Sequence, residues 1–153
     1  MEGTTIRTAT LADLETLLTF EQGIITAERP FDQTLDDDPI NYYDIAAMIA
    51  APHIEVVVAE TGNEIIGSGY ARIEDAKPYL KRQQYAYLGF MYVKPEHRGK
   101  GVNQLVIKKL QEWCIAQGIN ECRLEVYDEN TAAIKAYEKL GFSKLLITMR
   151  IGI

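Results

Sequence analysis

The amino-acid sequence predicts an α/β fold in which helices flank a mixed β-sheet. Two observations carry this prediction. Short apolar runs typical of strands alternate along the chain with segments whose apolar residues recur at helical spacing. Glycines, prolines and polar turn residues separate these segments. The expected order is strand, two helices, three strands, helix, strand, helix, strand.

The first elements are a short strand over residues 6–9 and a helix. Thr10, followed three residues later by Asp13, is a helix-capping pair. The expected apolar stripe of this helix is Leu14, Leu17 and Leu18. Residues 22–39 hold two prolines and a run of aspartates, and we interpret them as a loop. A second short helix is predicted over residues 41–50.

Three strands follow. Residues 55–60 and 65–73 are predicted strands, and the Gly62-Asn63 pair between them is typical of a turn. After a polar connection over residues 77–83, residues 85–93 form a long run that is apolar on both faces. This composition indicates a central strand.

The last part of the chain returns to alternating helices and strands. From Val102 the apolar residues follow helical spacing, and Gly118 ends that helix. The remaining predicted elements are a strand over 122–127, a helix over 130–140 and a last strand over 142–151.

Composition limits the function classes. A chain of 153 residues suits a single domain, here residues 1–153. The net charge of −6 argues against nucleic acid as a partner. No apolar run approaches the roughly 20 residues that span a bilayer, so a membrane role is not expected. The start has no signal segment. We therefore expect a soluble, cytoplasmic protein. The histidines, His53 and His97, lack further ligands at useful spacing, so no metal site is expected.

A glycine-rich turn, Arg98-Gly99-Lys100-Gly101, joins the central strand to the long helix. A helix N-terminus offers unpaired N–H groups and partial positive charge, glycines allow close approach of the backbone, and two basic side chains add charge. The turn therefore predicts an anion site. It is not a Walker loop, because no Ser or Thr follows Lys100. The competing interpretation is a basic turn that only caps a helix.

Two motifs occur in tandem. The first is Val93-x-Pro95-x-x-Arg98-Gly99-Lys100-Gly101. The second is Asn130-x-x-Ala133-Ile134-x-x-Tyr137-x-x-x-Gly141-Phe142. Together they resemble motifs A and B of the GCN5-related N-acetyltransferases, the GNAT family, and the resemblance covers nearly the whole chain. It implies a mixed, mostly antiparallel central sheet flanked by helices. One departure is Asn103, where the family usually has Gly or Ala.

The resemblance implies acetyl-CoA as the cofactor, with its pyrophosphate on the turn. The pantetheine arm would lie where the strands ending at Val93 and Tyr127 separate. The implied cofactor-binding residues are Met91, Val93, Arg98, Gly99, Lys100, Gly101, Val102, Asn103, Asn130 and Tyr137.

Acetyl transfer to an amine needs a neutral amine and a protonated leaving thiolate. An amine with a pKa of about 10.4 is almost entirely charged at pH 7, so a general base is useful. Tyr137 is the candidate acid, because it lies two helical turns after Asn130. The competing interpretation is a core tyrosine on the same apolar stripe.

Glu125 is the candidate base, directly or through a water. It is the only acid in the apolar run Leu124-Glu125-Val126, and a buried carboxylate there would have a raised pKa. Some bacterial ribosomal-protein N-terminal acetyltransferases are similar in this segment. The alternative is an ion pair with Arg123 or Lys144. Many family members carry a glutamate on the preceding strand, where this chain has Gly89 and Phe90.

The acceptor is expected to be a primary amine on a small molecule or a peptide. Residues 22–40, the start of the second helix and the 77–83 connection would surround it, with Asp36, Asp37 and Asp38 to attract a cation. Tyrosines that could line the pocket are Tyr42, Tyr43, Tyr70, Tyr79, Tyr85 and Tyr87. The alternatives are a non-catalytic acyl-CoA-binding sensor, an acyltransferase for hydroxyls or longer acyl chains, and a nucleotide-phosphate site. The last strand could also pair with a second subunit in a homodimer.

Overall fold

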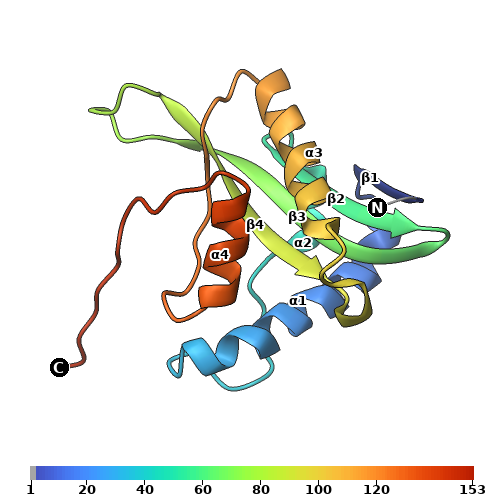
Figure 1. Ribbon diagram of the computed structural model, residues 1–153, viewed down its shortest axis with the longest axis horizontal. Coiled ribbons are helices and arrows are strands. Elements are labelled where there is room, and N and C mark those ends of the chain that lie inside the picture. The colour runs from blue at the N-terminus through green and yellow to red at the C-terminus, as the bar shows by residue number, and fades with distance from the viewer. Residues whose placement is uncertain (1–2) are drawn as a thin grey trace.

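The centre of the molecule is a five-stranded sheet in the order β1-β2-β3-β4-β5 (Figure 1). The computed structural model describes residues 3–153. The strands are β1 (Thr4–Thr8), β2 (Ile54–Thr61), β3 (Glu64–Asp75), β4 (Gln84–Val93) and β5 (Cys122–Arg123). Neighbouring strands from β1 to β4 pair antiparallel, and β4 pairs parallel with β5. The sheet is therefore mixed and mostly antiparallel, as predicted.

Helices cover both faces of this sheet (Figure 1). They are α1 (Leu14–Glu28), α2 (Ile45–Ala50), α3 (Val102–Ala116) and α4 (Thr131–Lys139), with short 3-10 turns η1 (Leu11–Asp13), η2 (Arg29–Phe31) and η3 (Pro95–His97). Helix α3 packs on one face, and α1 and α2 pack on the other. Within residues 3–153, no helix is both long enough and apolar enough to cross a membrane.

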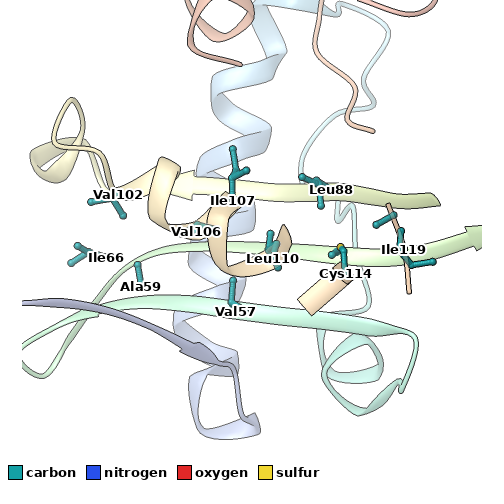
Figure 2. Close-up of a cluster of buried hydrophobic side chains, with 12 residues drawn as sticks. Val57, Ala59, Ile66, Leu88, Val102, Val106, Ile107, Leu110, Cys114 and Ile119 are labelled. Carbon is teal, nitrogen blue, oxygen red and sulfur yellow. The ribbon is translucent and has the colours of Figure 1, made fainter. Parts of the chain in front are cut away.

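The β2 strand illustrates why the sheet lies in the middle. Val57 and Ala59 belong to the cluster under α3, whereas Val56 and Val58 belong to the cluster under α1 and α2. Alternate side chains point to opposite faces of a strand, so a strand that is apolar throughout is buried on both sides. Figure 2 shows the α3 cluster, in which Val106 and Leu110 lie against the sheet.

Two close approaches at glycines fix the helices against the sheet. A Cβ at Gly69 of β3 would lie 2.7 Å from Val106 Cγ1, so α3 sits directly on the backbone there. A Cβ at Gly23 of α1 would lie 2.7 Å from Tyr92 Cε2. In both cases the absence of a side chain lets a neighbouring side chain fill the space.

Helix α1 corrects the prediction of a loop from residue 22. The helix continues to Glu28, because Gly23 makes room for Tyr92 and Ile25 is buried. The buried face consists of Leu17, Phe20, Glu21 and Ile25, whereas Leu18, which we expected in the apolar stripe, is 42% exposed. Pro30 does not prevent a further helical turn after α1, because it lies in the first turn of η2, where its missing N–H is tolerated.

The C-terminal part also differs from the prediction. Strand β5 contains only two residues, and the predicted strand over 142–151 does not form. Residues 142–153 instead run away from the body of the molecule (Figure 1, red). A strand needs a neighbouring strand for its backbone hydrogen bonds, and the described residues of this chain provide none. None of residues 121–153 is fully buried.

Candidate active site

The turn before α3 exposes backbone donors. Gly99 and Gly101 have φ values of 74° and 82°, in the left-handed region that favours glycine. No other residue comes within 4 Å of a Cβ built at either position, so the space beside the turn is open. The first helical bond joins Leu105 N to Gly101 O at 3.2 Å. The amides that precede Leu105 in the helix therefore have no helical partner, and they sit at the positive end of the helix dipole.

Basic side chains flank this turn. The Arg98 Nε donates to Val93 O at 2.8 Å, and its guanidinium lies 5.7 Å from the centre of the Tyr92 ring. Arg98 thus holds the turn against the end of β4. Lys100 is exposed and forms no ion pair within the described residues. The open turn, its free amides and these cations are the groups that an anion site would need.

Strand β4 carries a bulge opposite β3. Phe90 has a φ of 57°, which is rare for a residue with a side chain. The register with β3 shifts at the same place, between Ser68 and Tyr70. The buried Ser68 hydroxyl donates to Phe90 O at 2.9 Å and so fixes the bulge from inside. On the other side, β4 pairs with β5 only as far as Tyr87, and the two segments then separate.

The bulge decides which backbone groups of β4 face this separation. Ala86 N donates to Glu121 O at 2.9 Å, toward β5, and Lys94 N donates to Ile66 O at 2.8 Å, toward β3. Successive residues of a strand alternate between its two edges, so two even-numbered residues would face the same edge without a bulge. The shift turns the backbone of Met91 and Val93 toward the separation, the side on which the family resemblance implies contacts with the cofactor. The carbonyl oxygen of Val93 already accepts from Arg98, so only the N–H of Val93 is available to a ligand.

Tyr137 of α4 faces the first turn of α3. Its ring packs edge-on to Phe142 at 5.9 Å. Burial raises the pKa of Tyr137, and the nearby Asn103 side chain opposes this with a smaller effect. Asn103 Oδ1 is buried and has no hydrogen-bond partner within residues 3–153. The residue that departs from the family pattern therefore links the anion-binding turn to the candidate acid.

Asn130 has a structural role that the sequence did not predict. Its Oδ1 accepts from Ala133 N at 3.2 Å and caps α4. The side-chain nitrogen remains available for a ligand. The cap also fixes the start of the helix that carries Tyr137.

Glu125 lies on the segment that continues β5, but its side chain is exposed. The burial that we predicted for this carboxylate is therefore missing. The alternative ion pair is not formed either, because Arg123 pairs with Glu121. Glu125 instead lies beside Tyr87, where burial first and then this carboxylate raise the pKa of the phenol.

Sequence reasoning missed Glu28, at the end of α1. Burial raises the pKa of Glu28, and its charge acts on Tyr42, Tyr127 and Tyr137. The Tyr42 hydroxyl is buried and lies beside the Glu28 carboxylate. A sequence signal existed: Glu28 follows Glu21 by seven residues, which is the same face of a helix. The signal was lost when residues 22–39 were interpreted as a loop.

Glu21 positions the segment before α2. Its buried Oε2 accepts from Tyr42 N at 2.9 Å and from Tyr43 N at 2.7 Å. Tyr43 then contacts Tyr70 and Phe90, at 5.8 and 5.1 Å between ring centres. Tyr70 in turn lies 6.3 Å from Tyr87. A continuous aromatic wall therefore runs between the bulge and Glu125.

Other predicted pocket residues lie elsewhere. Tyr79 is 79% exposed. Tyr85 lies under the Arg123 guanidinium at 4.0 Å and lines a separate hollow of about 410 Å³ with the 77–83 connection. Arg29 binds Asp36 O and the Asp38 carboxylate, so the aspartate run is partly held by the protein itself.

His97 has neighbours that the sequence did not reveal. Ligand atoms of Glu64, Glu96 and His97 lie within 4.8 Å of one another, although Glu64 is distant in the sequence. Lys94 Nζ binds Glu64 Oε1 at 2.8 Å, so a positive charge already occupies this group. We therefore assign it no metal role.

Comparisons with known proteins identify the family and the fold. Among curated proteins, the thialysine N-epsilon-acetyltransferase of Bos taurus is 42% identical over 59 residues, 39% of this chain and 35% of the relative. The chain thus spans only about a third of that relative's length. Among solved structures, a mutant of the BH1408 protein of Bacillus halodurans has a TM-score of 0.86 at 20% identity, covering 97% of this chain and 99% of that one.

A predicted acetyltransferase of Clostridium acetobutylicum, solved with acetyl-CoA, has a TM-score of 0.73 at 19% identity and covers 97% of this chain and 96% of its own. At these identities the solved structures show the fold alone. The profile of the acetyltransferase (GNAT) family matches residues 18–142. Because this match covers most of the sequence, the chain belongs to the acetyltransferase (GNAT) family.

Proposed function

We propose that the protein is an N-acetyltransferase that moves an acetyl group from acetyl-CoA to a primary amine by direct attack. The observation that carries the proposal is the meeting of the α3 turn and Tyr137 across Asn103. Through Asn103, the groups proposed to hold the pyrophosphate and the phenol proposed as the acid lie close together. Membership of the GNAT family and the acetyl-CoA in a structural relative support the same conclusion.

The residues present fit acetyl-CoA, which supplies the acetyl thioester when bound. The glycines leave open space at the turn, and the free amides of α3 suit a pyrophosphate. The outward backbone groups of Met91 can bond an amide-containing arm, as can the N–H of Val93. Asn103 Oδ1, buried without a partner, needs a donor that such an arm contains.

Tyr137 is proposed as the acid toward the leaving thiolate. Burial raises its pKa, so the phenol stays protonated at neutral pH and can donate a proton. Asn130 holds the helix that carries it. A thiol with a pKa of about 8.5 is a fair leaving group already, so the gain in rate that Tyr137 can supply is modest.

Two carboxylates lie toward the acceptor side, and we give them different roles. Glu125 is the proposed base, directly or through a water, because it is exposed to solvent and has no ion-pair partner among the described residues. Glu28 is proposed to bind the acceptor ammonium, because it is half-buried beside Tyr42 and its charge reaches Tyr127 and Tyr137. A carboxylate with aromatic neighbours is a suitable site for an alkylammonium group.

Amine-dependent release of thiol from acetyl-CoA tests the proposal. The panel should include lysine, thialysine, a polyamine, an aminoglycoside and a peptide with a free N-terminus, with the matching alcohols and longer acyl-CoAs as controls. We expect release with at least one amine, formation of the N-acetyl product by mass spectrometry, and little release without amine. Tight binding of acetyl-CoA with no release for any acceptor would favour a sensor, and stabilisation by ATP but not by CoA would favour a nucleotide site. Either result would overturn the proposal.

A further inference from the structure

The carboxylate of Asp32, directly after η2, is sheltered by polar and aromatic neighbours. Its side chain is only 13% exposed. Oδ1 accepts from Thr34 N at 2.9 Å and from Thr34 Oγ1 at 2.6 Å, and Oδ2 accepts from the Tyr127 hydroxyl at 3.3 Å. The Tyr127 ring stacks on Phe31, with 5.9 Å between the ring centres. A sheltered anion beside two aromatic rings is a suitable site for an organic cation.

This carboxylate already binds a cation of the same chain. Arg150 Nη2 donates to Asp32 Oδ1 at 2.8 Å, and Nη1 donates to Thr34 Oγ1 at 2.9 Å. The bond from Arg150, and then those from Thr34, hold the pKa of Asp32 below its usual range, so the carboxylate is charged at neutral pH. The Arg150 side chain is 65% exposed, on a segment that forms no helix or strand. An ion pair with so exposed a partner is weak, so a ligand cation can displace it.

A second carboxylate lies close by in the chain. Glu28, to which the proposed function assigns the acceptor ammonium, ends α1, and only η2 separates it from Asp32. Burial first, and then the charges of Asp32 and Glu28, raise the pKa of Tyr127, so both carboxylates lie near this phenol. Glu28 also acts on Tyr137, whose pKa is raised mainly by burial. Glu28 is therefore the carboxylate nearer the proposed acid, and Asp32 is the more distant one.

We propose that Asp32 is a second cation subsite of the acceptor, and that Arg150 occupies this subsite in the free protein. The inference rests on the proposed function and names its substrate class, an amine that carries a second positive charge. One ammonium group binds at Glu28 and supplies the amine that is acetylated. The other displaces Arg150 from Asp32. A monoamine makes only the first contact and leaves Arg150 in place.

The role of Arg150 separates this proposal from a purely structural ion pair. As an occupant of the subsite, Arg150 competes with a dicationic acceptor but not with a monoamine. Its removal should therefore favour the dication, whereas removal of Asp32 should disfavour it. If the ion pair only held residues 142–153 in place, the loss of either partner would have the same effect.

The first test compares acceptors that differ only at the end remote from the reacting amine. Each α,ω-diamine of three to eight carbons is paired with the monoamine and the ω-amino acid of the same length, and amine-dependent thiol release from acetyl-CoA is measured. We expect kcat/KM of the best diamine to exceed that of its monoamine at least tenfold. The amino acid should be the poorest acceptor, because Asp32 repels its carboxylate. Equal values for diamine and monoamine, or a preference for the amino acid, would overturn the subsite.

The second test measures the ratio of kcat/KM for the diamine to that for the monoamine in variants. Asp32→Asn should lower this ratio at least fivefold, and Arg150→Gln should raise it at least threefold. Lys144→Gln is the matched control, because it removes the only other cation of residues 142–153, and it should change the ratio less than twofold. Circular dichroism checks that the variants are folded. A change in the same direction for Asp32→Asn and Arg150→Gln would refute the proposal.

Direct binding distinguishes a failure of this inference from a failure of the proposed function. Calorimetric titration of the diamine and the monoamine into the full chain saturated with CoA requires no acetyl transfer. Arg150→Gln should tighten the diamine at least threefold relative to the monoamine. If binding follows this pattern but no amine releases thiol, the transfer function is wrong and the cation subsite is supported. If thiol is released with no preference for the diamine, the transfer function is supported and the subsite is wrong.

Discussion

The buried hydroxyl of Ser68 donates a hydrogen bond of 2.9 Å to the main-chain oxygen of Phe90. This bond holds a residue whose φ of 57° costs backbone energy. The bulge that results shifts the alternation of β4, so that Met91 and Val93 turn their backbone toward the β4–β5 separation. A single side chain in β3 thus sets the orientation of the proposed cofactor contacts.

Removal of this hydroxyl should weaken both the fold and the cofactor site. Ser68→Ala is expected to lower the free energy of unfolding by about 1–3 kcal/mol, because it leaves a buried carbonyl unpaired. The KM for acetyl-CoA should rise more than the KM for the amine. Thr19→Ala is the control, since the Thr19 hydroxyl makes a similar bond to Glu15 O on an exposed helix surface. Urea unfolding and steady-state kinetics measure both effects, and equal losses in the two variants would contradict the role of the bulge.

The turn can be tested with two glycines in similar conformations. Gly101 and Gly118 have φ values of 82° and 79°, and neither would bring a Cβ within 4 Å of another residue. Substitution by Ala should therefore cost each variant a similar stability, about 1–2 kcal/mol. Only Gly101 lies at the proposed phosphate site. Calorimetric titration should show at least tenfold weaker binding of acetyl-CoA for Gly101→Ala and near-normal binding for Gly118→Ala. Normal binding by both variants would place the pyrophosphate elsewhere.

The ion pair between Arg7 and Asp13 predicts a pH dependence of stability. The bond from Arg7 holds the pKa of the buried Asp13 carboxyl below its usual range. A lowered folded-state pKa stabilises the protein above the unfolded pKa of about 3.9, and this stabilisation is lost as the pH falls through the folded value. Asp13→Asn should therefore reduce the free energy of unfolding by about 2 kcal/mol at pH 7, and the difference should shrink below pH 4. A difference that stays constant down to pH 2 would show that the charge is not responsible.

Substitution of Glu125 and of Glu28 should change the steady-state kinetics in different ways. Glu125→Gln is expected to lower kcat and to remove the acidic limb of the pH–rate profile, because the base is lost. Glu28→Gln is expected to raise the KM for the amine by about tenfold with a smaller change in kcat, because an ammonium contact worth roughly 1.4 kcal/mol is lost. Steady-state kinetics over a pH range separate the two. If Glu28→Gln alters the pH profile and Glu125→Gln does not, the roles are reversed.

The sequence predicted the elements whose signals are local. The turn at Gly62 and the helix that Gly118 ends both depend on residues a few positions apart, and the structure has them. The sequence also predicted on which elements the two motifs lie, because a strand that leads through a glycine turn into a helix is a local pattern.

The predictions were wrong where contacts between residues distant in the sequence determine the local structure. We predicted a loop from residue 22, yet Tyr92 of β4 packs against Gly23 and the helix continues to Glu28. Leu18 fits a helical stripe, yet Leu17 and Phe20 form the buried side of that turn and Leu18 is 42% exposed. Residues 142–151 have the alternating pattern of a strand but have no partner strand within residues 3–153. Glu125 sits in an apolar run that is buried only if a neighbouring strand covers it.

The most direct measurement compares wild type with Tyr137→Phe in two quantities, the Kd for acetyl-CoA from calorimetry and kcat for amine-dependent thiol release. The proposed N-acetyltransferase predicts a Kd within about threefold of wild type and a kcat at least tenfold lower, because only the proton donor is removed. An unchanged kcat at saturating acetyl-CoA would contradict the role of Tyr137 as the acid.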